Sequence, residues 1–227
     1  MLIALFPIKE KSQRIKNKNF KLFCGKPLYR WMLDKLIKNK NINKIIINTD
    51  SKIILSLKNK IDKKVIVRKR EKSLIGHHIS MNKIIKSDID YANIHFKDVN
   101  KANFLMTHST NPLISNKTIN KCYEKFIKCK TKIDSLFSVN SYKSRFYDHN
   151  IKPINHNSKK LIQTQFLKEI NEENSCIYLF TKKSFFKNNN RIGTKPMVFK
   201  TPIEESIDID EQSSWNFAIN LMNKNEK

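Results

Sequence analysis

The sequence predicts a single α/β domain in which a mostly parallel sheet is flanked by helices. Short apolar runs alternate along the chain with segments whose apolar residues recur at helical spacing, and strands joined by helical crossovers pair in parallel. Of the 227 residues, 39% are hydrophobic, which is enough to bury one core without disulfides. Since we find neither an internal repeat nor a linker, we expect one domain spanning residues 1–227.

The individual elements follow from local patterns. Leu2–Pro7 is a continuous apolar run, typical of a strand buried on both faces. Pro27 stands near the start of a helical pattern, and Ser115 is a suitable N-cap for another. A polar, weakly patterned stretch at 140–174 predicts a projecting arm. The predicted strands are 2–7, 45–50, 64–68, 104–107, 134–139 and 175–180, and the predicted helices are 27–37, 51–58, 81–96, 115–127 and 213–222.

The charge of the chain is strongly positive. There are 45 Lys and Arg against 20 Asp and Glu, giving a formal net charge of +25. Such a balance favours polyanionic partners, namely nucleic acid, anionic lipid or phosphorylated small molecules. The excess is almost all lysine and is spread along the whole chain, whereas a nucleic-acid surface is localised and richer in Arg and aromatic residues. We therefore interpret the charge as a solvated surface and expect no nucleic-acid partner.

Membrane and metal-cysteine sites are not indicated by the sequence. No run approaches the roughly 20 apolar residues of a membrane span, and the first apolar run is too short for a signal peptide. The four cysteines form no Cys-x-x-Cys pair, which argues against a zinc site or a disulfide. We expect a cytoplasmic protein with no membrane partner.

Candidate chemistry lies where the predicted parallel strands end, because ligands of such sheets bind outside the carboxyl ends of the strands. The loop 9–19 leaves the first strand and is dense in Lys and Arg, as expected where a triphosphate is cradled. It lacks the Gly-x-x-x-x-Gly-Lys-Ser/Thr spacing of a Walker loop. The other strand ends are 49–50, 68–80 and 107–111.

An acidic segment, Glu204–Glu211, stands out in this basic chain. Alternation along an extended segment places Asp208 and Asp210 on one face. Two such carboxylates suit Mg²⁺, which is commonly bound through one or two carboxylates and substrate phosphates. Alternatively, Asp210 and Glu211 are favourable charges at the N-terminus of the last helix. The spacing alone leaves both interpretations open.

Six segments carry a resemblance to a known family. They are 3–19, Gly25–Leu28, 47–51, 107–113, 174–178 and 205–210. In this order and spacing they resemble the motifs of the acylneuraminate cytidylyltransferase family, which includes the CMP-sialic acid synthetases and the CMP-Kdo synthetases. The resemblance covers essentially the whole chain. It implies a Rossmann-like nucleotidyltransferase domain whose projecting arm makes the contacts of a homodimer.

The resemblance also implies a reaction and a set of site residues. A hydroxyl of an acidic sugar would attack the α-phosphorus of CTP, releasing pyrophosphate and forming a CMP-sugar with the help of Mg²⁺. By resemblance, Lys9, Arg14, Lys18 and Asp210 would be catalytic, and Asp208 and Asp210 would hold the metal, with Asp210 the stronger ligand. The nucleotide site would comprise Lys9, Ser12, Arg14, Lys18, Asn19, Lys26, Arg68 and Ser80, and the sugar site His108, Thr110, Asn111, Arg145, Gln163, Gln165 and Asn174.

This chain departs from the family pattern at three places. One is Gly76-His77-His78, which replaces the Asp that usually follows Arg68 in the family. The first loop has Lys9, Glu10, Lys11, Gln13 and Arg14 where the family has Arg, glycines and Lys-Gly, and His108 stands where relatives carry Gln. An imidazole gains positive charge below about pH 6.5, so we expect an acceptor that differs from the usual sialic acid. Two other functions stay open: nucleotidyl transfer to a phosphorylated or aldonic acceptor, and nucleic-acid binding on the same scaffold.

Overall fold

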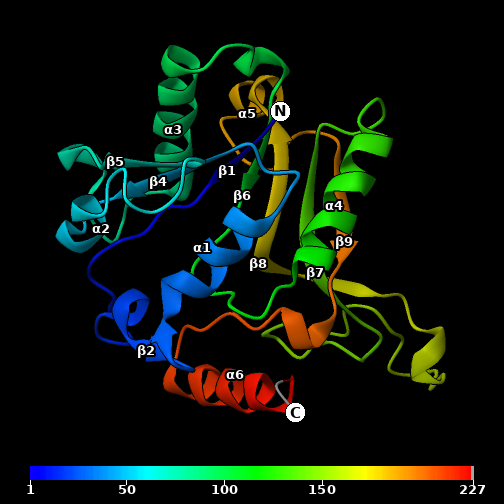
Figure 1. Ribbon diagram of the computed structural model, residues 1–227. Helices are drawn as coiled ribbons and strands as arrows, with labels where there is room; N and C mark the ends of the chain where they lie inside the picture. The colour runs from blue at the N-terminus through cyan, green and yellow to red at the C-terminus, as the bar shows by residue number, and fades with distance from the viewer. Residues whose placement is uncertain (226–227) are drawn as a thin grey trace.

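A seven-stranded sheet forms the centre of the computed structural model, which describes residues 1–225 (Figure 1). The strand order is β5-β4-β1-β6-β8-β7-β9, and β8 runs antiparallel to both neighbours while the other pairs are parallel. The predicted α/β domain with a mostly parallel sheet is therefore confirmed. The strands are β1 (Leu2–Leu5), β4 (Lys44–Thr49), β5 (Val65–Lys69), β6 (Asn103–Met106), β7 (Ser135–Tyr142), β8 (Ile170–Thr181) and β9 (Pro196–Lys200).

Helices cover both faces of the sheet because alternate strand residues point to opposite sides. Leu2 and Ala4 of β1 pack with α1, α2 and α4, whereas Ile3 and Leu5 pack with α3 and α5. Ser115 caps α4, as its side chain accepts a hydrogen bond from the Thr118 amide. The helices are α1 (Leu28–Lys38), α2 (Lys52–Ser56), α3 (Met81–His95), α4 (Asn116–Cys129), α5 (Lys182–Asn188) and α6 (Gln212–Asn225), with short 3₁₀ turns at Lys18–Phe20, Lys72–Leu74, Val99–Lys101, Thr164–Phe166 and Ile203–Glu205.

A third apolar cluster joins the two ends of the chain. A small hairpin of β2 (Leu22–Phe23) and β3 (Lys26–Pro27) turns through Cys24 and Gly25, which both have positive φ. Phe23 of this hairpin packs against Trp215 of α6, and Ile209 is buried in the same cluster. Figure 1 shows α6 lying beside the hairpin. The cluster thereby fixes the acidic segment next to the loop that follows β1.

The sequence missed α5, β9 and the hairpin. The helix α5 begins with a capping box formed by Thr181 and Ser184, which is a readable but short signal. The strand β9 begins with a proline and lies at the edge of the sheet, where proline is tolerated. Both β7 and β8 extend into the stretch predicted as an arm, so the part outside the sheet is 143–169, which projects from the molecule in Figure 1.

A bulge in β8 shapes the sheet beside the candidate site. The register shifts between the pairs Phe137–Tyr178 and Val139–Glu173, so β8 carries extra residues there. Ser175, within the bulge, has φ of 60°. This left-handed conformation is unfavourable for a residue with a Cβ atom.

We predict that Ser175→Gly stabilises the fold. Removing the Cβ atom relieves the left-handed strain and should raise the free energy of unfolding by about 1 kcal/mol. For a chain of this size the midpoint of thermal unfolding should rise by about 2–4 °C in calorimetry. Ser141→Gly in β7, where φ is not positive, is the control and should lower the midpoint. A lower midpoint for Ser175→Gly would contradict the strain argument.

Candidate active site

A pocket of about 420 Å³ opens at the carboxyl ends of the parallel strands. Successive strands run outward in one direction from β1 to β5 and then in the other from β6, so the order reverses between β1 and β6. This reversal is the position at which open α/β sheets bind ligands. The pocket is lined, among others, by Lys18, Arg70, His108, Ser175, Arg191 and Asp208.

The loop after β1 is held against the acidic segment by a buried lysine. The Lys18 ammonium, whose side chain is 9% exposed, donates to the Ile209 carbonyl at 2.5 Å and to Asp210 Oδ1 at 2.7 Å. Arg14, which is exposed, donates to Asp210 Oδ2 at 2.7 Å. The two loop cations predicted to act together therefore converge on one carboxylate.

Other residues of this loop line the pocket or support it. Lys9 and Ser12 line it, and Ser12 Oγ is buried without a hydrogen-bond partner among residues 1–225. Asn19, also lining it, donates to the Lys9 carbonyl at 2.7 Å and accepts from Ser109 Oγ at 2.7 Å. A buried hydroxyl without a partner beside a pocket is a polar group that a ligand can satisfy.

Asp208 and Asp210 both line the pocket, while Ile209 between them is buried. Burial raises the pKa of Asp208, and the neighbouring Asp210 charge raises it further. Burial also acts to raise the pKa of Asp210, but the hydrogen bonds and charges of Lys18 and Arg14 outweigh it and lower the pKa. The Asp210 carboxylate therefore lines the pocket, and it accepts hydrogen bonds from the first loop and not from the last helix.

The two aspartates fit a hard divalent cation. Asp208 Oδ1 is buried and has no hydrogen-bond partner in the described chain, which leaves an oxygen free for a ligand. Both Asp210 oxygens already accept hydrogen bonds from cations, so Asp208 is the carboxylate with more capacity left to bind a metal ion. Within residues 1–225 no group of three or more His, Cys, Asp or Glu side chains suits a metal ion. A cation here would need substrate oxygens as further ligands, the usual arrangement for Mg²⁺.

Arg70, which the sequence analysis did not single out, is the arginine that faces the pocket from the β5 side. It is 6% exposed and lines the pocket. Arg68, the residue predicted for this role, does not line it. Its guanidinium instead donates to the Ser87 carbonyl at 2.6 Å and to Asp88 at 2.8 Å. Both arginines fall in the strand-end segment 68–80, but only the position beyond the end of β5 reaches the pocket.

The tip of β6 contributes His108, Ser109 and Thr110 to the pocket. Desolvation, followed by the nearby positive charge of Arg191, lowers the pKa of His108 to about 3. This corrects the expectation that the imidazole gains charge near pH 6.5, because a neighbouring cation and burial both disfavour imidazolium. Asn111 is fully buried and does not line the pocket.

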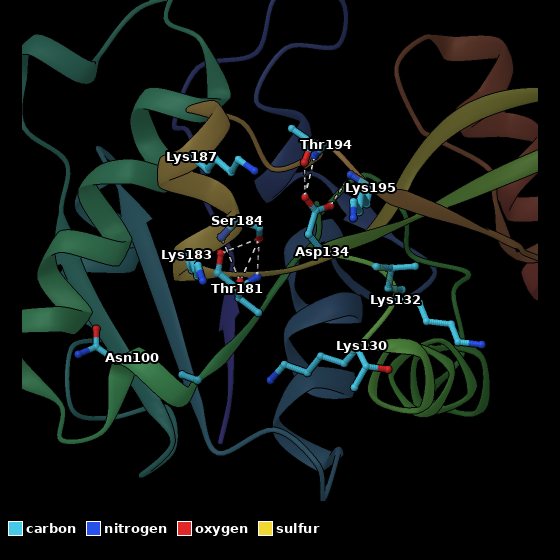
Figure 2. A pocket seen from close by; sticks show the side chains of 13 residues that line it. Asn100, Lys130, Lys132, Asp134, Thr181, Lys183, Ser184, Lys187, Thr194 and Lys195 are labelled. Atoms are coloured by element: carbon cyan, nitrogen blue, oxygen red, sulfur yellow. Dashed lines mark hydrogen bonds between the residues drawn. The ribbon is translucent and has the colours of Figure 1, made fainter.

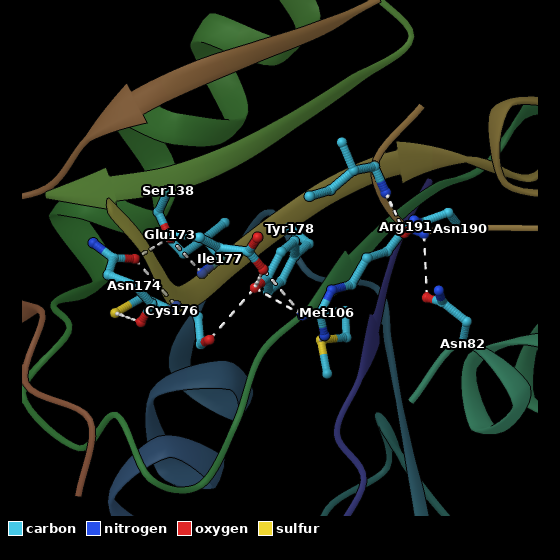
Figure 3. Close-up of polar contacts among 12 residues, drawn as sticks. Asn82, Met106, Ser138, Glu173, Asn174, Cys176, Ile177, Tyr178, Asn190 and Arg191 are labelled. Atoms are coloured by element: carbon cyan, nitrogen blue, oxygen red, sulfur yellow. Dashed lines mark hydrogen bonds and ion pairs between the residues drawn. The ribbon is translucent and has the colours of Figure 1, made fainter. Parts of the chain in front are cut away.

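Arg191 was also not predicted from the sequence. Its guanidinium lies on the β8 side of the pocket. Its Nη2 donates to Tyr178 Oη at 2.9 Å and to Glu173 at 3.1 Å, and its Cζ lies 3.7 Å from the centre of the Tyr178 ring. Figure 3 shows this side chain directed toward Tyr178 and Met106. Arg191 follows α5 in an unpatterned loop, so no local signal marks it.

The remaining predicted residues lie outside the pocket. Lys26 pairs with Asp34 at 2.8 Å and stacks on Trp31. Ser80 caps α3 through a hydrogen bond from the Asn82 amide. Asn174 is buried and bonded to Ser138, Asn140 and Thr201, as Figure 3 partly shows. Three further residues lie in the projecting arm: Arg145, which is half-buried and donates to the Ile162 carbonyl, and the exposed Gln163 and Gln165.

A second pocket, of about 470 Å³, lies at the other end of the strands, beside the starts of β6 and β7 (Figure 2). It is bordered by the start of β7 and by α5, and none of the predicted site residues lines it. Its ionisable lining residues are five lysines and one aspartate: Lys130, Lys132, Lys183, Lys187, Lys195 and Asp134. Three amide or hydroxyl groups of Thr194 and Lys195 already satisfy the Asp134 carboxylate, so this pocket offers no acid for catalysis.

Comparison with known proteins decides the family. The sequence pattern of the cytidylyltransferases matches residues 3–222, which is nearly the whole chain. The chain belongs to the cytidylyltransferase family. It is therefore a CTP-dependent nucleotidyltransferase, and the resemblance found in its motifs is confirmed. Two pseudaminic acid cytidylyltransferases of Campylobacter jejuni subsp. jejuni, from serotypes O:23/36 and O:2, are each 22% identical to it over 95% of this chain and 94% of theirs.

Solved cytidylyltransferases share the fold. A CMP:2-keto-3-deoxy-manno-octonic acid synthetase complexed with CTP superposes with a TM-score of 0.66 at 11% identity, covering 99% of each chain. A 4-diphosphocytidyl-2C-methyl-D-erythritol synthase from Anaerococcus prevotii gives a TM-score of 0.66 at 13% identity, covering 98% of this chain and 96% of that chain. These likenesses support the fold of the family. Among the described helices, none is long and apolar enough to cross a membrane.

We predict that His108 stays neutral through the physiological pH range. With its pKa lowered to about 3, the imidazole should show no titration between about pH 5 and 8 in NMR spectra, with its signals assigned by comparison with His108→Gln. The unfolded state takes up a proton near pH 6.5 and the folded state does not, so this group lowers stability as the pH falls. A titration midpoint near 6.5 would contradict the effect of Arg191 and burial.

Proposed function

We propose that this enzyme transfers CMP from CTP to a hydroxyl of an acidic sugar, releasing pyrophosphate in a Mg²⁺-dependent reaction. The observation that carries the proposal is one pocket, at the switch point of the sheet, that joins two carboxylates with cations on both sides. Asp208 and Asp210 lie between the loop of β1 and the tip of β6, and Ile209 donates to the Thr110 carbonyl at 2.8 Å. Such an arrangement suits a charged nucleotide and a charged acceptor together.

The nucleotide side of the proposal comprises the loop after β1 and the end of β5. Lys9, Lys18 and Arg70 provide positive charge, and Ser12 Oγ provides a hydroxyl that has no hydrogen-bond partner in the described part of the chain. Lys18 already bonds Asp210, so a phosphate would join an existing charge pair and not create a new one. Because the backbone of this loop is poor in glycine, we assign phosphate binding mainly to side chains.

The acceptor side comprises the tip of β6 and the bulged part of β8. Arg191 offers a guanidinium, and the neutral His108 offers both a donor and an acceptor for sugar hydroxyls. A carboxylate is the natural partner of a guanidinium, which supports an acidic acceptor. The names of the pseudaminic acid and 2-keto-3-deoxy-manno-octonic acid enzymes agree with an acidic acceptor, whereas the third name refers to 2C-methyl-D-erythritol.

The mechanism follows from positioning and charge. Transfer of a phosphoryl-type group requires little covalent chemistry from the protein, so holding the acceptor hydroxyl in line with the α-phosphorus supplies much of the rate. Lys18 and Arg14, which both contact Asp210, would stabilise the negative charge that develops on the departing pyrophosphate. Bound Mg²⁺, held by Asp208 and Asp210, would neutralise phosphate charge.

The projecting arm is proposed to meet a second copy of the chain. It exposes large apolar side chains, including Ile151, Leu161 and Phe166, which are 80%, 83% and 70% exposed. Apolar side chains gathered on one projection mark an interaction surface. Arg145, Gln163 and Gln165 lie near the same surface and in a dimer would approach the partner's acceptor site, as the family resemblance implies.

We predict that the wild-type enzyme releases pyrophosphate from CTP, in preference to the other three nucleotides, only with Mg²⁺ and an acidic sugar. Asp208→Asn removes a charge that balances the cation and should reduce turnover by at least a hundredfold while folding survives. Pyrophosphate release against a panel of sugar acids, phosphorylated sugars and aldonic acids measures both effects. Asp98→Asn, an exposed control that does not line the pocket, should not change the rate.

Three results would count against this proposal. Full activity of Asp208→Asn with unchanged magnesium dependence would remove the metal assignment. Turnover only with a phosphorylated or aldonic acceptor would replace the acidic sugar by the alternative acceptor. If CTP turnover is absent and nucleic acid binds with an affinity that falls steeply with salt, the nucleic-acid function is favoured.

We also predict that Arg191→Gln impairs binding of the acceptor and not of CTP. Loss of the guanidinium removes the ionic partner of the acceptor carboxylate, so KM for the sugar should rise at least tenfold while KM for CTP changes less than twofold. Steady-state kinetics with each substrate varied in turn separates the two constants. Arg30→Gln, at an ion pair on α1, is the matched control. Equal increases in both KM values would show that Arg191 only supports the sheet.

A further inference from the structure

Arg70 is held in the pocket wall by three hydrogen bonds to two strand ends. Its Nε donates to Asn48 Oδ1 at 2.9 Å, and its Nη2 donates to the Asn48 carbonyl at 2.8 Å and to the Ile8 carbonyl at 3.3 Å. Nη1 has no protein partner in the described chain. The guanidinium is thus fixed along one edge and has donors left for a ligand in the pocket that Arg70 lines.

The orientation of the Asn48 amide determines whether this arrangement exists. Arg70 is only a donor, so the amide must present its oxygen to Nε. The amide nitrogen then points the other way, where it donates to Asp88 Oδ1 at 2.7 Å. An ionised carboxylate accepts hydrogen bonds and cannot donate them, so Asp88 enforces the same orientation from the opposite side. The reversed amide would place two donors together at Arg70 and two acceptors together at Asp88.

Asp88 is itself fixed away from solvent. It lies on α3 with its side chain 1% exposed, and Arg68 Nη1 donates to its Oδ1 at 2.8 Å. Arg68 is further anchored by the Ser87 carbonyl and packs over the ring of Tyr91. Oδ2 of Asp88 has no partner among the described residues. Arg68, Asp88, Asn48 and Arg70 therefore form one chain of hydrogen bonds that runs from α3 through β4 to the pocket.

We propose that Asp88 is a positioning residue for nucleotide binding, which acts through Asn48 to aim the Arg70 guanidinium at the bound CTP. Asp88 does not line the pocket, so it contacts no substrate itself. Its carboxylate holds the Asn48 amide in the one orientation that receives Arg70, and Arg68 holds the carboxylate. This inference rests on the proposed function only in taking CTP as the ligand of Arg70, and it does not depend on the acceptor.

The charged groups around Asp88 give the chain of contacts a pH dependence. Burial raises the pKa of Asp88 to about 7, in spite of the hydrogen bond from Asn48 and the charge of Arg68. From β5 and its end it faces Arg68 and Arg70, and from β4 the neutral Asn48. Arg68 also pairs with the exposed Glu71 at 3.4 Å. A proton on Asp88 removes the charge that favours both donors. The affinity for CTP of the wild type, relative to an Asp88→Asn variant, should therefore decline as the pH falls below about 7.

The test measures CTP binding directly by calorimetry, together with KM for each substrate. Asp88→Asn should weaken CTP binding about tenfold, the size expected when a hydrogen bond to a charged group is lost, with KM for the acceptor unchanged. Asp90→Asn on the same helix, where an exposed pair with Lys86 is removed, is the matched control and should have no effect. In an Arg70→Lys background, Asp88→Asn should have no further effect on CTP affinity, because its target has been removed.

The exchange variant Asn48→Asp with Asp88→Asn tests whether the loss of CTP affinity is caused only by impaired folding. In this variant the carboxylate at position 48 accepts from Arg70 Nε, and the amide at position 88 donates to that carboxylate. The CTP affinity that either single substitution loses should therefore return. Normal CTP affinity in Asp88→Asn, equal loss in the Arg70→Lys background, or no recovery in a folded exchange variant would overturn the proposal. Failure of the wild type to bind CTP would instead overturn the proposed function, and this inference with it.

Discussion

The buried ammonium of Lys18 is the interaction on which the pocket depends. It is nearly removed from water, and its charge is balanced by Asp210 and by the Ile209 carbonyl, 191 residues farther along the chain. A cation withdrawn from solvent is costly unless it is paired and hydrogen-bonded, so the loop after β1 and the acidic segment must be together for either to be stable. The third apolar cluster, in which Phe23, Ile209 and Trp215 are buried, supplies the contacts that bring them into register.

This pairing also separates two neighbouring carboxylates. Asp210 accepts hydrogen bonds from two cations, which lower its pKa, whereas Asp208 is more deeply buried and one of its oxygens has no hydrogen-bond partner among residues 1–225. Carboxylates whose environments push their pKa values apart are typical of functional sites. The net charge of +25 contributes little to this arrangement, because the cations that matter are the few that the fold places at one edge of the sheet.

On the β8 side of the pocket, burial and a nearby charge again shift a pKa, although fewer charged groups lie there. Arg191 is bound to Tyr178 and Glu173 on the bulged part of β8, and its field helps to keep His108 neutral. The bulge includes Ser175 in a left-handed conformation, so a strained backbone position lies beside the side chains that line this part of the pocket. The side chains at the two ends of the pocket are therefore positioned by different features, a buried ion pair at one end and a β-bulge at the other.

By itself, the sequence determined the α/β class, the main strands and helices and the strand ends where the site lies, because these follow from local periodicity and from the rule for parallel sheets. It also indicated Lys18, Asp208 and Asp210, since motifs in order carry position as well as type. Only the tertiary structure decided that Arg70 and not Arg68 faces the pocket, that Arg191 joins it from an unpatterned loop, and that burial and Arg191 lower the pKa of His108. The reason is physical. Which way a side chain points beyond a strand end, and how much water and charge surround it, depend on contacts between residues that are far apart in the sequence.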